Sequence, residues 1–112
     1  MNKDFLQSAA GRKLGQRYLA LKESLVDLGW LIHGSVTPNH PGHWRWTTKV
    51  KSKTVTLALS QEQTLLFQEA IANHRNLESI LRQMRAISQE VLLKSAPGTR
   101  KRPARKIIPK PA

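Results

Sequence analysis

The chain has 112 residues, 19 lysines and arginines against seven aspartates and glutamates, a formal net charge of +12, and no cysteine. This length suits one domain. The missing cysteine excludes disulfides, thiolate metal sites and cysteine nucleophiles, and no apolar run reaches the about 18 residues of a membrane span. The charge is typical of proteins that bind polyanions, nucleic acids first. We therefore expect neither a membrane partner nor a small-molecule substrate, and a cytoplasmic location.

The first 43 residues predict a lead-in, a helix, a short strand and a loop. Residues 1–13 show little periodicity and lack the apolar segment of a secretory signal, so a flexible lead-in is expected. A helix is then predicted over residues 13–28 and ends at Gly29. A short strand over 30–37 and a loop over 37–43 follow, because the loop segment holds two prolines, an asparagine and a glycine. The apolar face of the helix is Leu14, Tyr18, Leu21, Leu25 and Leu28.

Alternation of apolar and polar residues predicts a β-hairpin over 44–50 and 53–59. A two-residue loop at Lys51 and Ser52 pairs Trp46 with Leu57 and gathers the large apolar side chains on one face. Lys-Ser is a poor pair for a tight turn, so a longer, looser tip is the alternative. The face expected to pack on the helices comprises Trp44, Trp46, Val55, Leu57 and Leu59.

A long helix is predicted over 61–93, because Ser60 and Gln63 form a capping box and no glycine or proline interrupts it. Its apolar residues follow a heptad repeat with one polar interruption at Asn73, which favours a coiled coil. The alternative is a helical hairpin with the first helix. We expect the first helix and the hairpin to cover its first half, and residues 84–93 to pack on a second copy. The expected oligomer interface is Leu77, Ile80, Met84, Ile87 and Val91.

Basic residues concentrate in two segments. The segment 94–112 holds four prolines and no acid, so it is predicted to be disordered and to contact phosphates without sequence specificity; a neutral, solubilising tail is the alternative. The hairpin presents a basic ribbon of the width of a DNA major groove, or else an ordinary solvated face. The candidate nucleic-acid contacts are Arg45, Lys49, Lys51, Lys53, Lys94, Arg100, Lys101, Arg102, Arg105, Lys106 and Lys110.

Catalytic motifs are missing from the sequence. The acids lie on predicted polar helix faces, the glycines are dispersed, and no Gly-x-Ser-x-Gly elbow occurs. His33, His40 and His43 lie within 11 residues, which is compatible with zinc, but no carboxylate is local. We expect them to serve the loop or contact phosphates. The sequence thus predicts a non-enzymatic protein with no catalytic residues, no metal site and no cofactor.

Several segments together resemble a known family. They are Leu-Gly-Trp-Leu-Ile-His-Gly-Ser-Val (28–36), Trp-Arg-Trp-Thr-Thr-Lys-Val (44–50), Lys-Thr-Val-Thr-Leu-Ala-Leu-Ser-Gln-Glu-Gln (53–63), Ala-Ile-Ala-Asn-His-Arg-Asn-Leu-Glu (70–78) and Met-Arg-Ala-Ile-Ser (84–88). Over residues 14–95 the chain resembles a family of small uncharacterised bacterial proteins often associated with transposases and mobile elements. Many members carry Cys-Gly-Lys-x-x-Cys-x-Cys before the hairpin, where this chain has residues 37–42 and no cysteine. The resemblance implies a setting in DNA mobility and no mechanism.

The predicted fold is α+β: a helix, a β-hairpin or three-stranded antiparallel meander, and a long C-terminal helix, in a single domain over 14–93. The expected function is that of a nucleic-acid-binding accessory protein, with DNA ahead of RNA as the ligand. The alternative is a coiled-coil interaction module that forms a homodimer or binds a transposase through the long helix. A ribosome- or RNA-associated factor is a third possibility, because basic tails also suit RNA.

Overall fold

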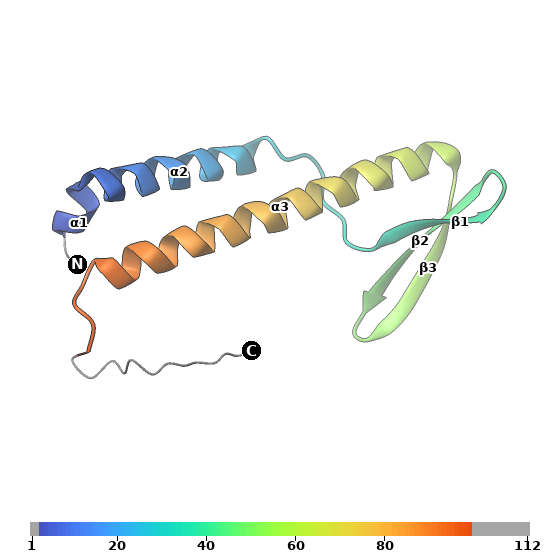
Figure 1. Cartoon of the computed structure of the whole chain (residues 1–112). Helices are drawn as coiled ribbons and strands as arrows, with labels where there is room; N and C mark the ends of the chain where they lie inside the picture. Colours follow the sequence, from blue (N-terminus) through green and yellow to red (C-terminus); the bar gives the residue numbers. More distant parts are fainter. Residues whose placement is uncertain (1–2, 100–112) are drawn as a thin grey trace.

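The computed structural model describes residues 3–99 and shows the predicted α+β class (Figure 1). A three-stranded antiparallel sheet in the order β1-β2-β3 lies at the start of the longest helix, and a helical hairpin forms the rest. The molecule is elongated, with extents of 62 × 32 × 21 Å. The elements are α1 (Lys3–Gln7), α2 (Ala9–Val26), β1 (Ser35–His40), β2 (His43–Val50), β3 (Lys53–Leu59) and α3 (Gln61–Lys94).

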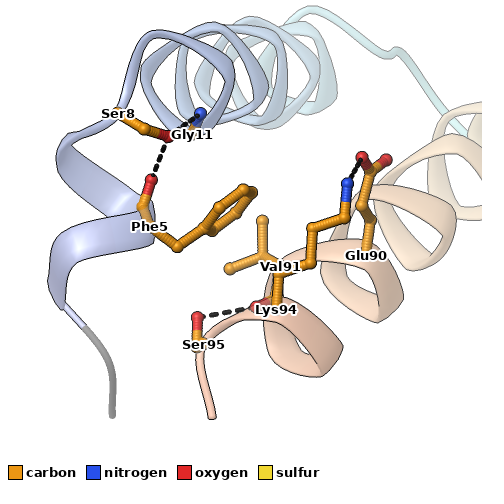
Figure 2. Close-up of polar contacts among 7 residues, drawn as sticks. All are labelled: Phe5, Ser8, Gly11, Glu90, Val91, Lys94 and Ser95. Atoms are coloured by element: carbon orange, nitrogen blue, oxygen red, sulfur yellow. Dashed lines mark hydrogen bonds and ion pairs between the residues drawn. The ribbon is translucent and has the colours of Figure 1, made fainter. Parts of the chain in front are cut away.

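The first long helix begins at Ala9, earlier than the predicted residue 13, and a short helix precedes it. Ser8 is the N-cap: its hydroxyl accepts a hydrogen bond from the Gly11 amide at 3.1 Å and donates one to the Phe5 carbonyl at 2.6 Å (Figure 2). Gly11 is buried, and a side chain there would strike the backbone of Phe5. The glycine that weakens the helical pattern of the sequence is therefore the residue that lets α1 fold back on α2.

Helix α2 packs antiparallel along the second half of α3 (Figure 1). All five residues predicted as its apolar face are buried or half-buried, with Leu14 the most covered. Under α2, Ile80 and Ile87 of α3 are only 5% and 4% exposed, and Met84 is half-buried. The prediction that α2 covers the first half of α3 is wrong, because α2 covers Met84 and Ile87 in the second half, while Leu92 and Leu93 are exposed.

Chain connectivity explains this reversal. The connection after α2 is held against the first third of α3, where the Ile32 amide donates to the Ala70 carbonyl at 3.3 Å. Because α2 ends at this connection and is antiparallel to α3, its start must lie near the C-terminal end of α3. Its 18 residues span about 27 Å of the about 51 Å of α3. Helix α2 therefore matches the second half of α3 in length and leaves the first half to the sheet.

The far end of the helical hairpin is closed by α1. The Nζ atom of Lys94 lies 5.6 Å from the centre of the Phe5 ring, within cation–π range (Figure 2). Beside it, Ser95 is 2% exposed and its hydroxyl donates to the Val91 carbonyl at 2.6 Å. These contacts hold the last turn of α3, so the ordered helix includes Lys94 and its cap Ser95.

Strands β2 and β3 form the predicted hairpin in the predicted register. Trp46 faces Leu57, Trp44 faces Leu59, and Val50 faces Lys53. The loop has only the two predicted residues, with φ of 52° at Lys51 and 70° at Ser52, so a looser tip does not form. Two positive φ values give a turn whose twist matches that of the strands, which offsets the cost of left-handed non-glycine residues.

Strand β1 occupies residues 35–40 and replaces both the predicted strand at 30–37 and most of the predicted loop at 37–43. It is an edge strand, where a proline is tolerated because no ladder bond is required on its outer side. Pro38 therefore pairs with Trp44, and the register shifts before His40 faces His43. Only Pro41 and Gly42 remain as the turn.

Sheet and helix meet mainly near the start of α3. The Trp46 and Phe67 rings contact at 5.2 Å between centroids, and Leu59 is buried. Toward the hairpin tip the predicted apolar face is open, since Val55 and Leu57 are 41% and 52% exposed. The predicted packing of this face is thus confirmed at its helix end only.

The capping box at the start of α3 is confirmed: Ser60 and Gln63 exchange backbone-to-side-chain hydrogen bonds of 3.0 and 3.1 Å. The heptad pattern is incomplete in the first turns, where Leu66 is 66% exposed and Thr64 is buried. Between residues 3 and 99, no helix is both long and apolar enough to cross a membrane.

Candidate nucleic-acid interface and the polar groove

Most of the net charge lies in the sheet and the tail. The segments that form the helices, residues 1–27 and 61–94, hold nine basic and seven acidic residues and are nearly balanced. Residues 28–61, which include the whole sheet, hold four basic residues and no acid, and residues 95–112 hold six basic residues and no acid. Of these, the four on the sheet fall within the described part of the chain.

Arg45 and Lys49 lie on the face of β2 opposite its tryptophans and are exposed, as strand alternation predicts. Between them Thr47 faces Thr56 of β3, with the two hydroxyl oxygens 3.5 Å apart. Lys51 is in the tight turn and Lys53 is the first residue of β3. The structure therefore brings the four predicted ribbon residues together on one hairpin, in two pairs: one along β2 and one at the tip.

Lys94 is separate from this ribbon. It belongs to the last turn of α3, where its ammonium lies 2.9 Å from a carboxylate oxygen of Glu90 and over the Phe5 ring (Figure 2). Lys94 was predicted to belong to the disordered tail, but it is part of α3 and has these intramolecular contacts. The remaining predicted phosphate contacts lie outside the described residues; they are Arg100, Lys101, Arg102, Arg105, Lys106 and Lys110.

A polar groove of about 440 Å³ has three walls: the sheet, the connection that precedes β1, and helix α3. Lys49 and Thr54 contribute from the hairpin, and His74, Arg75 and Glu78 contribute from α3. The complete lining is Ile32, His33, Gly34, Ser35, Thr47, Thr48, Lys49, Thr54, Ile71, His74, Arg75 and Glu78.

The four histidines form two pairs, of which only one joins residues that are close in the sequence. His40 and His43 face each other across the β1–β2 turn, with ring centroids 6.2 Å apart. His33 instead lies against His74 of α3, edge to face at 4.9 Å. One ligand atom each of His33, His74 and Glu78 lies within 4.8 Å of the others. The expected grouping of His33 with His40 and His43 is therefore wrong, because the connection carries His33 to α3 instead.

Three hydrogen bonds fix the backbone around His33. The Asn73 side chain donates to the Trp30 carbonyl at 3.0 Å, and Ile32 is bonded to α3 as described above. The Trp46 indole donates to the carbonyl of His33 itself at 2.9 Å. Gly34 follows at φ +121°, where an added Cβ would lie 2.5 Å from the Thr47 carbonyl oxygen. This segment is therefore clamped to both α3 and β2.

Asn73, His74 and Glu78 are the residues whose roles the sequence analysis missed. Asn73, the polar residue of the heptad pattern, is the side chain that holds the connection through its bond to the Trp30 carbonyl. The spacing of four between His74 and Glu78 places both on one helix face and was a readable signal. Their third partner, 41 positions before His74, is brought in by tertiary structure alone.

Comparison of the chain with models of known families, with curated proteins and with solved structures found no match.

Proposed function

We propose that the protein is a non-enzymatic nucleic-acid-binding accessory protein whose sheet and tail contact duplex DNA. The observation that carries this is the separation of charge: helical segments that are nearly balanced, and a sheet region and tail that hold basic residues without a single acid. A surface that lacks carboxylates attracts phosphates without a local repulsive partner. The mobile-element setting implied by the family resemblance fits a DNA ligand.

The hairpin suits this ligand in shape. Two antiparallel strands lie about 4.8 Å apart, and a ribbon of this width enters a major groove about 12 Å wide. Arg45 and Lys49 project from one face of the ribbon, with the hydroxyls of Thr47 and Thr56 between them. Lysines at the tip are placed for backbone phosphates, and the hydroxyls for phosphate or base edges.

The test is fluorescence anisotropy with a labelled duplex, a single strand and an RNA hairpin over a series of salt concentrations. Each phosphate contact contributes about −0.9 to the slope of log K against log salt on duplex DNA. Replacing Lys51 and Lys53 with alanine should therefore reduce the slope by about 2. Truncation after Thr99 removes six basic residues and should reduce it by up to about 5. This truncation point keeps Lys94 and the buried Ser95, so α3 is left intact.

The matched control is the double variant R82A/R85A, which removes two exposed charges from α3. It should leave the slope unchanged. Equal losses in the control and the ribbon variant would refute the interface, and absence of binding at low salt would refute the function. Tighter binding of the RNA hairpin than of the duplex would replace DNA by RNA as the ligand.

A second candidate function is protein interaction through self-association. Among described residues only six apolar side chains are buried, whereas twelve large hydrophobic ones are exposed, so the chain has much apolar surface to cover. Trp30, Leu31 and Leu66 form one such surface, here termed the Trp30 patch, and line a common depression beside Phe67. Trp30 is 90% exposed. In this candidate function a second copy of the chain covers the Trp30 patch. A transposase bound through α3 is the other partner considered, and it rests on the family resemblance alone.

Light scattering separates this candidate from the first. A dimer that dissociates on W30A/L66A substitution, while duplex binding by the monomer persists, supports self-association as an additional property. A wild-type chain that is monomeric at the concentrations of the binding assay refutes it.

A further inference from the structure

We infer that His33, His74 and Glu78 bind a divalent transition metal ion, with zinc the best match. Two imidazole nitrogens and one carboxylate oxygen form a donor set that suits zinc and its neighbours, and not magnesium or calcium, which prefer oxygen alone. Three protein ligands with a fourth position open to water are a recurrent zinc arrangement. No part of the nucleic-acid proposal requires this site.

The distances allow closure around an ion. The three ligand atoms lie within 4.8 Å of one another. Zinc bonds of about 2.0–2.1 Å in tetrahedral geometry separate neighbouring ligand atoms by about 3.4 Å. Each pair must therefore approach by at most about 1.4 Å, a shift that side-chain rotation supplies at an open position. His33 and Glu78 are both exposed, so their side chains have room to make this movement.

The backbone already holds the ligands in place. His74 and Glu78 are one turn apart on α3, so the helix fixes their backbone positions relative to each other. His33 is held opposite them by the bonds from Trp46 and to Ala70, and by the Asn73 clamp on Trp30. Ordering a loop is a large cost of building a metal site, and here most of that cost is met by the fold itself.

The ligand atoms are also available. Within residues 3–99, neither imidazole nor the Glu78 carboxylate has a hydrogen-bond or ion-pair partner, and the two rings contact each other edge to face. By contrast the Glu90 carboxylate is engaged by Lys94. The groove beside the three side chains leaves room for a water molecule as the fourth ligand. Lys49 and Arg75 line the same groove, so an anion is a natural alternative to that water.

The second histidine pair provides an internal control. His40 and His43 lie at the other end of the sheet, and no acid occurs between residues 28 and 61 to complete a site there. The chain has four histidines in total, so these two pairs account for every imidazole. A site at the groove predicts that substitutions of His33 and His74 weaken binding. Adventitious binding to surface histidines predicts that substitutions of His40 and His43 weaken it as well.

The experiment is calorimetric titration of the full chain with zinc chloride, repeated with cobalt(II) followed by visible absorption. We expect one ion per chain and a tetrahedral cobalt spectrum. H33Q, H74Q and E78Q should each weaken zinc binding by more than about tenfold, the loss that even outer-shell changes cause. H40Q/H43Q should bind as the wild type does. Far-UV circular dichroism shows that each variant is folded before it is scored.

Loss of binding in H40Q/H43Q with retention in the three ligand variants would overturn the inference, as would a wild-type chain that takes up no zinc at micromolar concentration. A thermal midpoint that rises with zinc in the wild type and in H40Q/H43Q, but not in H74Q, would support it independently, because the ion joins the connection to α3.

Discussion

Gly34 is a position at which a single added methyl group should be strongly destabilising. Its φ of +121° is one that side-chain-bearing residues rarely adopt, and an added Cβ would lie 2.5 Å from the Thr47 carbonyl oxygen and 2.6 Å from the Trp46 Nε1 atom. Neither neighbour can yield easily. The first is backbone in the central strand, and the second donates the hydrogen bond that holds His33.

The cost of G34A follows from these two effects. Backbone strain of this kind costs about 1–3 kcal/mol, and forcing an extra methyl into an occupied site costs about 1–3 kcal/mol. We expect the free energy of unfolding to fall by about 3–4 kcal/mol, taking mid-range values for both. At about 4–8 °C per kcal/mol for a domain of this size, the melting temperature should drop by roughly 12–32 °C.

Two other glycines separate these effects. At Gly42 φ is +81° but nothing lies within 4 Å of the added Cβ, so G42A should cost only the strain, about 1–2 kcal/mol. Gly15 lies inside α2 with open space around it, so G15A should raise stability by about 0.5–1 kcal/mol. Urea unfolding followed by circular dichroism measures all three. If G34A is no more destabilised than G42A, the close approach of the connection to β2 is wrong.

Two further substitutions test the turn and the clamp. S52G should raise the unfolding free energy by about 1 kcal/mol in the same assay, because Ser52 stands at φ 70° in a tight turn that favours glycine; a loss of stability would argue for a looser tip. N73L should lower it by about 1 kcal/mol, because the bond of Asn73 to the Trp30 carbonyl is removed. Higher stability together with dimer formation in N73L would restore the coiled-coil interpretation of the long helix.

The sequence alone determined the features that depend on neighbouring residues. Strand alternation placed all large apolar residues of the hairpin on one side in a single register, and the observed pairing of Trp46 with Leu57 follows it. The capping box at Ser60 and the apolar face of α2 were equally local. Separation of the charge was visible too, because it is a property of composition along the chain.

Tertiary structure decided what depends on residues far apart. The path of the connection at residues 27–34 directs α2 along the second half of α3, so Ile80 and Ile87 are covered within the chain. That path also explains why Asn73 stands in an otherwise apolar column and why His33 meets His74 rather than His40. Periodicity reports which side of an element is apolar, but not which neighbour covers it. A pair of residues 41 positions apart leaves no periodic signal, because only the folded backbone brings them together.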